Sequence, residues 1–302
     1  MMINNIKILV IILVFSICCL CLSFVTIHAD EGKESIGLAI LPCGDSLITY
    51  RKFYRLVTYL EQETGFNINF MVPKNVEEFK GSIKLKNIDF ALLGSHTYVE
   101  LAHLFDQNSL LRALTIEGKA FESAVVLVKK NSNIKKIEDL KGKTVMFGSR
   151  LSATKWVAAR LLFKKKGINI DKDLLSYSNG GCCEDIAFSV FLNKVDAGVT
   201  CAYFLKGRLQ EQSELGIDSG PFVVIGKTDL VPAWVLAARK GLRPDIIDTF
   251  NQALLRLDKN RPEHKNILDH AELGGFQKSK DEYYDCMRKM ISLLKENKEN
   301  SL

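Results

Sequence analysis

The sequence predicts an α/β protein with two lobes. Short apolar runs alternate with segments of helical periodicity, which is typical of parallel strands covered by helices on both faces. The chain leaves the first set of these units near Phe121 and returns to it near Gly226, which predicts two hinge crossings with a ligand cleft between the lobes. A length of 302 residues also suits two domains of ordinary size.

The composition excludes several classes of protein. Hydrophobic residues make up 47% of the chain and charged residues 25%, an ordinary globular balance that excludes extended disorder and collagen-like repeats. The net charge of +6 is scattered, and short basic runs such as Lys164-Lys165-Lys166 are typical of solvated helix ends. We therefore expect no nucleic-acid partner.

The first expected lobe begins with a compact apolar strand over residues 35–41. A helix follows, because Phe53, Val57 and Leu60 share one face and Gly65 stands just past its expected end. The other expected elements of this lobe are strands over 67–72 and 88–93 and a helix over 76–86.

The second expected lobe begins with an apolar strand over 124–128. A strand over 144–147 then leads into a helix that begins at Ser152 and ends at Gly167. The other expected elements of this lobe are strands over 174–177, 195–200 and 222–226 and a helix over 183–192. After the return crossing, we expect a strand over 231–238 and two C-terminal helices, around 246–257 and over 281–295. This order predicts a discontinuous lobe 1 over 30–121 and 227–302 and a lobe 2 over 122–226.

Residues 1–29 have the features of an export segment. Lys7 precedes an apolar run from Ile8 to Val25, and the small residue Ala29 precedes acidic Asp30, as in a secretory signal peptide. The apolar run is also long enough to span a membrane, so an uncleaved N-terminal anchor is the alternative. In either case we expect the rest of the chain in the periplasm or another extracytoplasmic compartment.

Several short segments together resemble one protein family. They are Gly37-Leu38-Ala39, Tyr59-Leu60-Glu61 before Thr64-Gly65, the run from Asp89 to Gly94, the run from Ile137 to Lys143, Phe147-Gly148-Ser149 before Ser152, and Val195-Asp196-Ala197-Gly198. Their joint order resembles the phosphate/phosphite/phosphonate-type periplasmic substrate-binding proteins of ABC transporters, over about residues 35–285. The resemblance implies a two-lobed periplasmic-binding-protein-like fold of type II, with two parallel-type sheets, and a binding protein without a cofactor.

The resemblance also implies an anion site. The family grips phosphonate with a Ser/Thr cluster at a helix start, where this chain has Ser152 and Thr154 shortly after Ser149, but Ala153 between them. The backbone N–H groups and hydroxyls of a helix N-terminus can hold an oxyanion, whereas the alternative role for Ser152 is an ordinary N-cap.

Further residues correspond to contact positions in the family. Ser95, His96 and Tyr98 follow a strand and start a helix where the family commonly places ligand contacts, with capping or packing as the alternative. Tyr203 and Trp234 stand where family members that recognise an amino group carry acidic residues. An aminoalkylphosphonate would therefore lack its ammonium partners, and Trp234 would supply an apolar wall.

Five cysteines follow the N-terminal segment, an odd number that cannot all pair within an exported chain. We expect Cys43, Cys182, Cys183 and Cys201 to face the cleft, and Cys286 to lie apart on the last helix. Three interpretations stay open, namely disulfide pairing of Cys43 or Cys201 with Cys182 or Cys183, thiolate binding of arsenite or a soft metal, and inert or redox-sensing thiols. The position of Cys183 at a helix start favours a lowered pKa, although the neighbouring Glu184 and Asp185 oppose that shift.

The leading functional prediction is an exported solute-binding protein that closes on a small phosphate- or phosphonate-type oxyanion and delivers it to an ABC permease. The alternatives are a ligand sensor for a membrane histidine kinase and a thiolate-based binder of arsenite or a soft metal. An enzyme is not expected. Thiamine-pyrimidine synthases resemble this fold but are intracellular and carry a longer cysteine motif, and the sequence lacks hydrolase and nucleotide-loop signatures.

Overall fold

The computed structural model describes residues 33–41, 45–206 and 221–299, and a compact unit of the chain begins at Ser35. The expected export segment 1–29 and Cys43 lie outside the described residues. Among the helices of the described ranges, none is long and apolar enough to cross a membrane.

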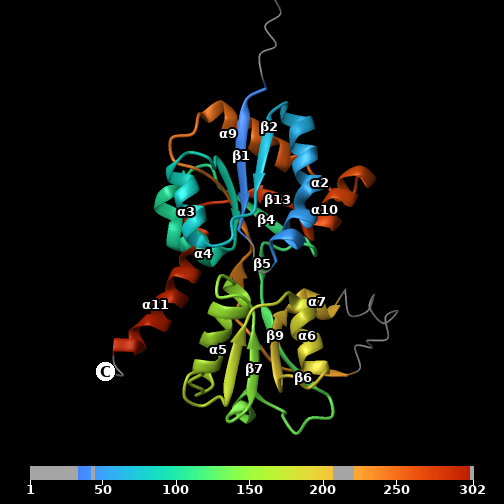
Figure 1. The fold of residues 1–302 in the computed structure, drawn as a ribbon, viewed down its shortest axis with the longest axis vertical. Helices are drawn as coiled ribbons and strands as arrows, with labels where there is room; N and C mark the ends of the chain where they lie inside the picture. The colour runs from blue at the N-terminus through green and yellow to red at the C-terminus, as the bar shows by residue number, and fades with distance from the viewer. Residues whose placement is uncertain (1–32, 42–44, 207–220, 300–302) are drawn as a thin grey trace, which may run out of the picture. The chain divides into compact units, whose positions relative to one another are not determined.

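The first lobe contains a six-stranded sheet with the order β13-β4-β12-β3-β1-β2. Its strands are β1 (Ser35–Ile40), β2 (Asn67–Met71), β3 (Phe90–Leu93), β4 (Leu111–Thr115), β12 (Val235–Ala238) and β13 (Leu273–Lys278). Its helices are α2 (Ser46–Thr64), α3 (Val76–Lys84), α4 (Ser95–Leu101), α9 (Pro244–Leu255) and α10 (Pro262–Ala271). Figure 1 shows this sheet with helices on both sides.

Both faces of the first sheet are buried, which explains why β1 is apolar along its length. Leu38 and Ile40 pack in one cluster with α2 and α9, whereas Ala39 and Leu41 pack in another with α3 and α4. Side chains of a strand alternate between its faces, so a strand covered on both sides has no polar positions to alternate with. The expected strand and helix at this end of the chain are confirmed, including Gly65 in the left-handed C-cap position of α2.

The second lobe contains a five-stranded sheet with the order β10-β6-β9-β7-β8. Its strands are β6 (Ala124–Lys129), β7 (Thr144–Phe147), β8 (Ser176–Asn179), β9 (Ala197–Cys201) and β10 (Phe222–Lys227). Its helical segments are η3 (Ala153–Ala158, a π-helix) running into α5 (Ala159–Lys165), then α6 (Cys183–Phe191) and α7 (Ala202–Lys206).

Two connections join the sheets, and they pair with each other. β5 (Phe121–Glu122) lies antiparallel to β11 (Val231–Pro232), and this two-stranded ribbon belongs to neither large sheet. A further contact between the lobes comes from α11 (Asp285–Glu299), which follows η5 (Asp281–Tyr284). Tyr284 is buried in the core of the first lobe, whereas Met287 and Met290 are buried in that of the second.

Both large sheets are mixed, whereas the sequence pattern predicts parallel-type sheets. The parallel pairing is present among β1, β2 and β3 and among β7, β8 and β9. In the first lobe, β12 is antiparallel to β3 and β4 because it enters directly from the hinge, without the crossover that a parallel strand requires. The lobe limits at residues 121 and 226 stay a prediction.

Gly37 provides a test of how closely β1 packs against the turn before β3. A Cβ at this position would lie 1.9 Å from the backbone oxygen of Asn87, a contact that only backbone movement could relieve. We expect Gly37→Ala to lower the free energy of unfolding by about 2 kcal/mol or more. The measurement is urea unfolding followed by circular dichroism.

Gly81→Ala is the matched control, because Gly81 lies inside α3 with open space around a built Cβ. Alanine has the higher helix propensity, so this variant should be as stable as the parent or more stable, by up to about 1 kcal/mol. Equal stability of the two variants would contradict the close packing inferred at Gly37.

Candidate functional site

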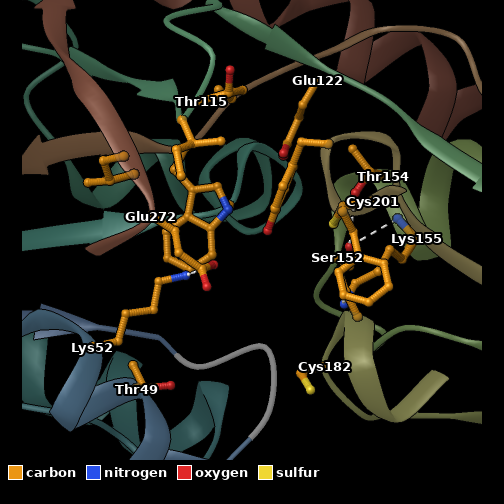
Figure 2. Close-up of a pocket in the computed structure, with 18 of the residues that line it drawn as sticks. Thr49, Lys52, Thr115, Glu122, Ser152, Thr154, Lys155, Cys182, Cys201 and Glu272 are labelled. Atoms are coloured by element: carbon orange, nitrogen blue, oxygen red, sulfur yellow. Dashed lines mark hydrogen bonds and ion pairs between the residues drawn. The ribbon is translucent and has the colours of Figure 1, made fainter. Parts of the chain in front are cut away.

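A cavity of about 820 Å³ lies between the two lobes at the hinge. Figure 2 shows Thr49, Lys52 and Glu272 on one side of it and Ser152, Thr154, Lys155 and Cys201 on the other. Of the residues predicted to bind ligand, Ser152, Thr154, Cys182, Cys183, Cys201, Tyr203 and Trp234 line this cavity. The fold therefore brings together side chains that lie up to 82 positions apart, from Ser152 to Trp234, in the sequence.

The start of η3 is the most polar part of the second-lobe wall. Ser152 is the N-cap residue, and its hydroxyl oxygen accepts a hydrogen bond of 3.0 Å from the backbone N–H of Lys155. The hydroxyls of Ser152 and Thr154 are 3.4 Å apart, and both residues are buried apart from their contact with the cavity. The N-cap role weighed for Ser152 is thus present, and it leaves the hydroxyl proton able to donate to a ligand.

Lys155 is buried beside these hydroxyls, and a glycine makes room for it. A Cβ at Gly148 would come within 2.5 Å of the Lys155 side chain, so the aliphatic part of Lys155 packs directly over the backbone after β7. Its ammonium nitrogen lies 4.0 Å from the sulfur of Cys183. A buried ammonium near two hydroxyls and a helix start gives this wall a positive potential.

Cys183 and Cys201 meet at the same wall. Cys183 is the first residue of α6, Cys201 is the last residue of β9, and both belong to a small buried cluster with Ala187 and Phe204. The hydrogen bond from the Cys201 thiol, together with the nearby Lys155 ammonium, lowers the pKa of Cys183 to about 6 despite its burial. The pKa of Cys201 is raised by the same hydrogen bond and by burial.

The pKa values of the neighbouring Cys182 and Tyr203 are raised, in contrast to that of Cys183. Burial raises the pKa of the Cys182 thiol to about 12, with a further contribution from Glu184. The pKa of Tyr203 is raised by the charge on Cys201 and by burial. Among the described cysteines, Cys182, Cys183, Cys201 and Cys286 carry free thiols, and Cys286 lies apart on α11 as expected.

Glu122 is a cavity residue that the sequence-based predictions do not include. It lies on β5 opposite Val231, and its side chain lines the cavity at the hinge. Burial raises the pKa of its carboxyl group to about 7, and the charge on Cys183 adds to this effect. A carboxyl group with this pKa can donate a hydrogen bond when protonated and repel an anion when ionised. Two sequence signals point to this position, namely its place in the first crossing and the resemblance, which sets a binding-site Tyr of the family at Phe121 or Glu122.

The first-lobe wall combines an apolar surface with an ion pair. Trp234 stacks on Phe53 with ring centroids 6.3 Å apart, and both residues line the cavity. Lys52 forms a 2.5 Å ion pair with Glu272, which occupies the left-handed C-cap position of α10. Lys52 and Glu272 also have no place among the sequence-based predictions.

Ser95, His96, Tyr98 and Ser149 lie outside the cavity lining, in contrast to the prediction. α4 packs against η3 and α11, so its first turn is covered by protein. The Tyr98 hydroxyl donates to Asp281 at 2.6 Å, and the His96 ring nitrogen Nε2 lies 3.4 Å from the Glu100 carboxylate. The Ser149 hydroxyl accepts from the backbone N–H of Leu151 within a turn. For α4 these contacts correspond to packing, one of the two alternatives weighed, whereas no side chain caps the start of this helix.

A metal site has no support in the described ranges. Among those residues, no group of three or more His, Cys, Asp or Glu side chains is placed to hold a metal ion. Cys43, the remaining thiol of the predicted cleft set, lies outside the described residues.

A protein-family model covers most of the chain. The family model described as "ABC transporter, phosphonate, periplasmic substrate-binding protein" matches residues 38–284. The phosphate-import protein PhnD of Mycolicibacterium smegmatis is 22% identical over 244 residues, which is 73% of this chain and 71% of that protein.

Two solved structures show the same fold. A binding protein component of an ABC phosphonate transporter from Pseudomonas aeruginosa has a TM-score of 0.71 at 18% identity and covers 85% of each chain. PhnD1 from Prochlorococcus marinus in complex with methylphosphonate has a TM-score of 0.71 at 19% identity, covering 87% of this chain and 98% of that one. The predicted two-lobed type II fold is confirmed by this similarity.

The pKa of Cys183 provides a test of the site's electrostatics. Because the Lys155 ammonium stabilises the thiolate, Lys155→Met should raise the pKa of Cys183 from about 6 by roughly one pH unit. The measurement is the pH dependence of Cys183 alkylation by iodoacetamide, with the modified peptide quantified by mass spectrometry. Lys166→Met is the control, because Lys166 is exposed at the far end of the same helix. An unchanged Cys183 pKa in Lys155→Met would show that the ammonium does not act on the thiol.

Proposed function

Because this chain belongs to the periplasmic substrate-binding proteins of phosphonate ABC transporters, we propose that its interlobe cavity binds a phosphate- or phosphonate-type oxyanion at the start of η3. The family and the solute-binding function predicted from the sequence are confirmed, and the family is one of binding proteins, not of enzymes. The chain is the substrate-binding component of an ABC transporter for phosphonate or phosphate.

The observation that carries the proposed site is the buried polar corner formed by Ser152, Thr154 and Lys155 in the cavity wall. Two hydroxyls can donate to the oxygens of an anion, and the ammonium supplies an opposite charge in a region of low dielectric constant. The helical segment that begins at Ala153 runs on through α5 to Lys165, so its first N–H groups and its dipole favour the same anion.

The opposite wall suits the substituent of a phosphonate. Trp234 and Phe53 form an apolar surface in the same cavity. A small alkyl group bonded to phosphorus would lie against these rings while its oxygens face Ser152 and Thr154. The proposed ligand is therefore phosphate or a phosphonate with a small apolar substituent.

The proposed partner of the ligand-bound protein is the membrane permease of its transporter. The family is periplasmic, and closure of the two lobes over the ligand would present the bound form to the permease. A histidine-kinase partner has no supporting observation in the described residues and stays an alternative prediction.

The role of Thr154 can be tested by removing one hydroxyl without changing its shape. Thr154→Val should raise the Kd for inorganic phosphate and for methylphosphonate by about tenfold or more, because a hydrogen bond to a charged ligand contributes roughly 1.5–3 kcal/mol. The measurement is calorimetric titration of the parent and the variant.

Thr249→Val is the matched control, since Thr249 is exposed on α9 and donates only to Asp245 of its own helix. Sulfate serves as the control ligand for anion selectivity. An unchanged Kd in Thr154→Val would remove Thr154 from the proposed site, and a parent protein that binds neither oxyanion would overturn the proposed ligand class.

A further inference from the structure

We propose that Cys183 and Cys201 form a redox-active dithiol in the wall of the binding cavity, and that its oxidation to a disulfide strengthens oxyanion binding at Ser152 and Thr154. The effect on affinity rests on the proposed function, whereas formation of the disulfide does not.

The fold brings the two thiols into contact through one close approach. A Cβ at Gly198 would lie 2.5 Å from Ile186, so the glycine lets α6 pack directly onto β9. The Thr200 hydroxyl on β9 donates to the Cys183 carbonyl at 3.4 Å, which holds the start of α6 at the end of the strand. Cys183 and Cys201 then share one buried cluster and a thiol–thiol hydrogen bond.

A small reagent can reach both thiols through the cavity, and the two thiols differ in pKa. They line a cavity of about 820 Å³, which has room for a low-molecular-weight disulfide. Cys183 is the attacking group, because the hydrogen bond from Cys201 and the Lys155 ammonium favour its thiolate. Cys201 keeps its proton until the second step. Cys182 does not compete as a nucleophile, because burial raises its pKa to about 12.

The reaction balances as thiol–disulfide exchange with a small organic disulfide, R–S–S–R. The Cys183 thiolate attacks one sulfur, the S–S bond of the reagent breaks, and one thiolate leaves and takes up a proton from water. Cys201 then attacks the sulfur of Cys183 in the mixed disulfide, and the Cys201 proton passes to the second departing thiolate. The protein dithiol is oxidised, and the reagent is reduced to two thiols.

Lys155 couples this chemistry to the anion site. Its ammonium lies 4.0 Å from the Cys183 sulfur, and its backbone N–H is bonded to the Ser152 hydroxyl. In the reduced protein the Cys183 thiolate opposes an incoming oxyanion and reduces the positive potential of Lys155. A disulfide carries no charge, so oxidation removes this repulsion.

The other titratable groups near the dithiol are present in both redox states. Glu122 faces it from β5 and Tyr203 from α7, while the charges of Lys52 and Glu272 act from the first lobe. The charge on Cys183 contributes to the raised pKa of Glu122, so Glu122 titrates differently in the reduced and the oxidised protein. Comparing the two redox forms of Glu122→Gln therefore isolates the effect of the thiols.

The first arm of the experiment needs no ligand. The folded protein is treated with bis(2-hydroxyethyl) disulfide, and the linked peptides are mapped by mass spectrometry before and after reduction with dithiothreitol. We expect a Cys183–Cys201 bridge with loss of two hydrogens, reversed by the reductant. Cys201→Ser should stop at the mixed disulfide on Cys183, whereas Cys182→Ser and Cys286→Ser should still form the bridge. A bridge to Cys43 or Cys182, or no reaction at Cys183, would overturn the inference.

The second arm measures the Kd for methylphosphonate and for inorganic phosphate in both redox forms. The titrations run from about pH 5 to about pH 8, a range in which cysteine thiols of folded proteins commonly titrate. Near pH 5 the reduced thiol is neutral and the two forms should bind alike. Near pH 8 the oxidised form should bind about tenfold more tightly. Cys183→Ser, with folding checked by circular dichroism, should lose this redox dependence.

The outcomes separate the two proposals. A mapped bridge with equal affinities in both forms would overturn the coupling, although the ligand class would stand. Absence of binding by both forms would overturn the proposed function, and with it the coupling, while the mapping result would still decide whether the dithiol exists.

Discussion

The antiparallel pairing of β5 with β11 is the constraint on which the binding site depends. Val231 pairs with Glu122 and Pro232 with Phe121, so the two connections between the sheets are held side by side. Because both crossings lie in this one ribbon, the strand ends and helix starts of the two lobes face a common cavity (Figures 1 and 2). Glu122 belongs both to the ribbon and to the cavity lining, which places an ionisable group where the lobes would move.

The charge of this cavity is set by a small group of interacting side chains. Lys155 favours an anion, whereas Cys183 and Glu122 oppose one when they are ionised. Their pKa values of about 6 and about 7 lie close to neutrality, so the potential at Ser152 depends on protonation and on the oxidation state of the thiols. The potential of a cavity built in this way depends more on pH than that of a cavity lined only by hydroxyls and backbone N–H groups.

Most elements with strong local signals were predictable. The helix of Phe53 and Leu60 and the strands at Ala39, Leu92 and Val126 have unambiguous apolar patterns. β4, α10 and β13 are missing from the sequence-based expectations. β13 contains Gly274, whose built Cβ would lie 2.2 Å from the Thr115 backbone oxygen, so close packing of two strands required a residue of low strand propensity.

The sequence by itself determined the family, the two-lobed architecture and the polar helix start at Ser152 and Thr154, because these depend on local patterns and on their order along the chain. Tertiary structure alone decided which predicted residues share a site. In the folded protein, Tyr98 is buried and bonded to Asp281, in the segment before α11. Cys183 lies in one cluster with Cys201, because Gly198 lets α6 pack closely on β9. Tertiary structure also placed Glu122, Lys52 and Glu272 in the cavity. Side-chain direction and the close approach of distant elements depend on packing across the whole fold, which no local pattern encodes.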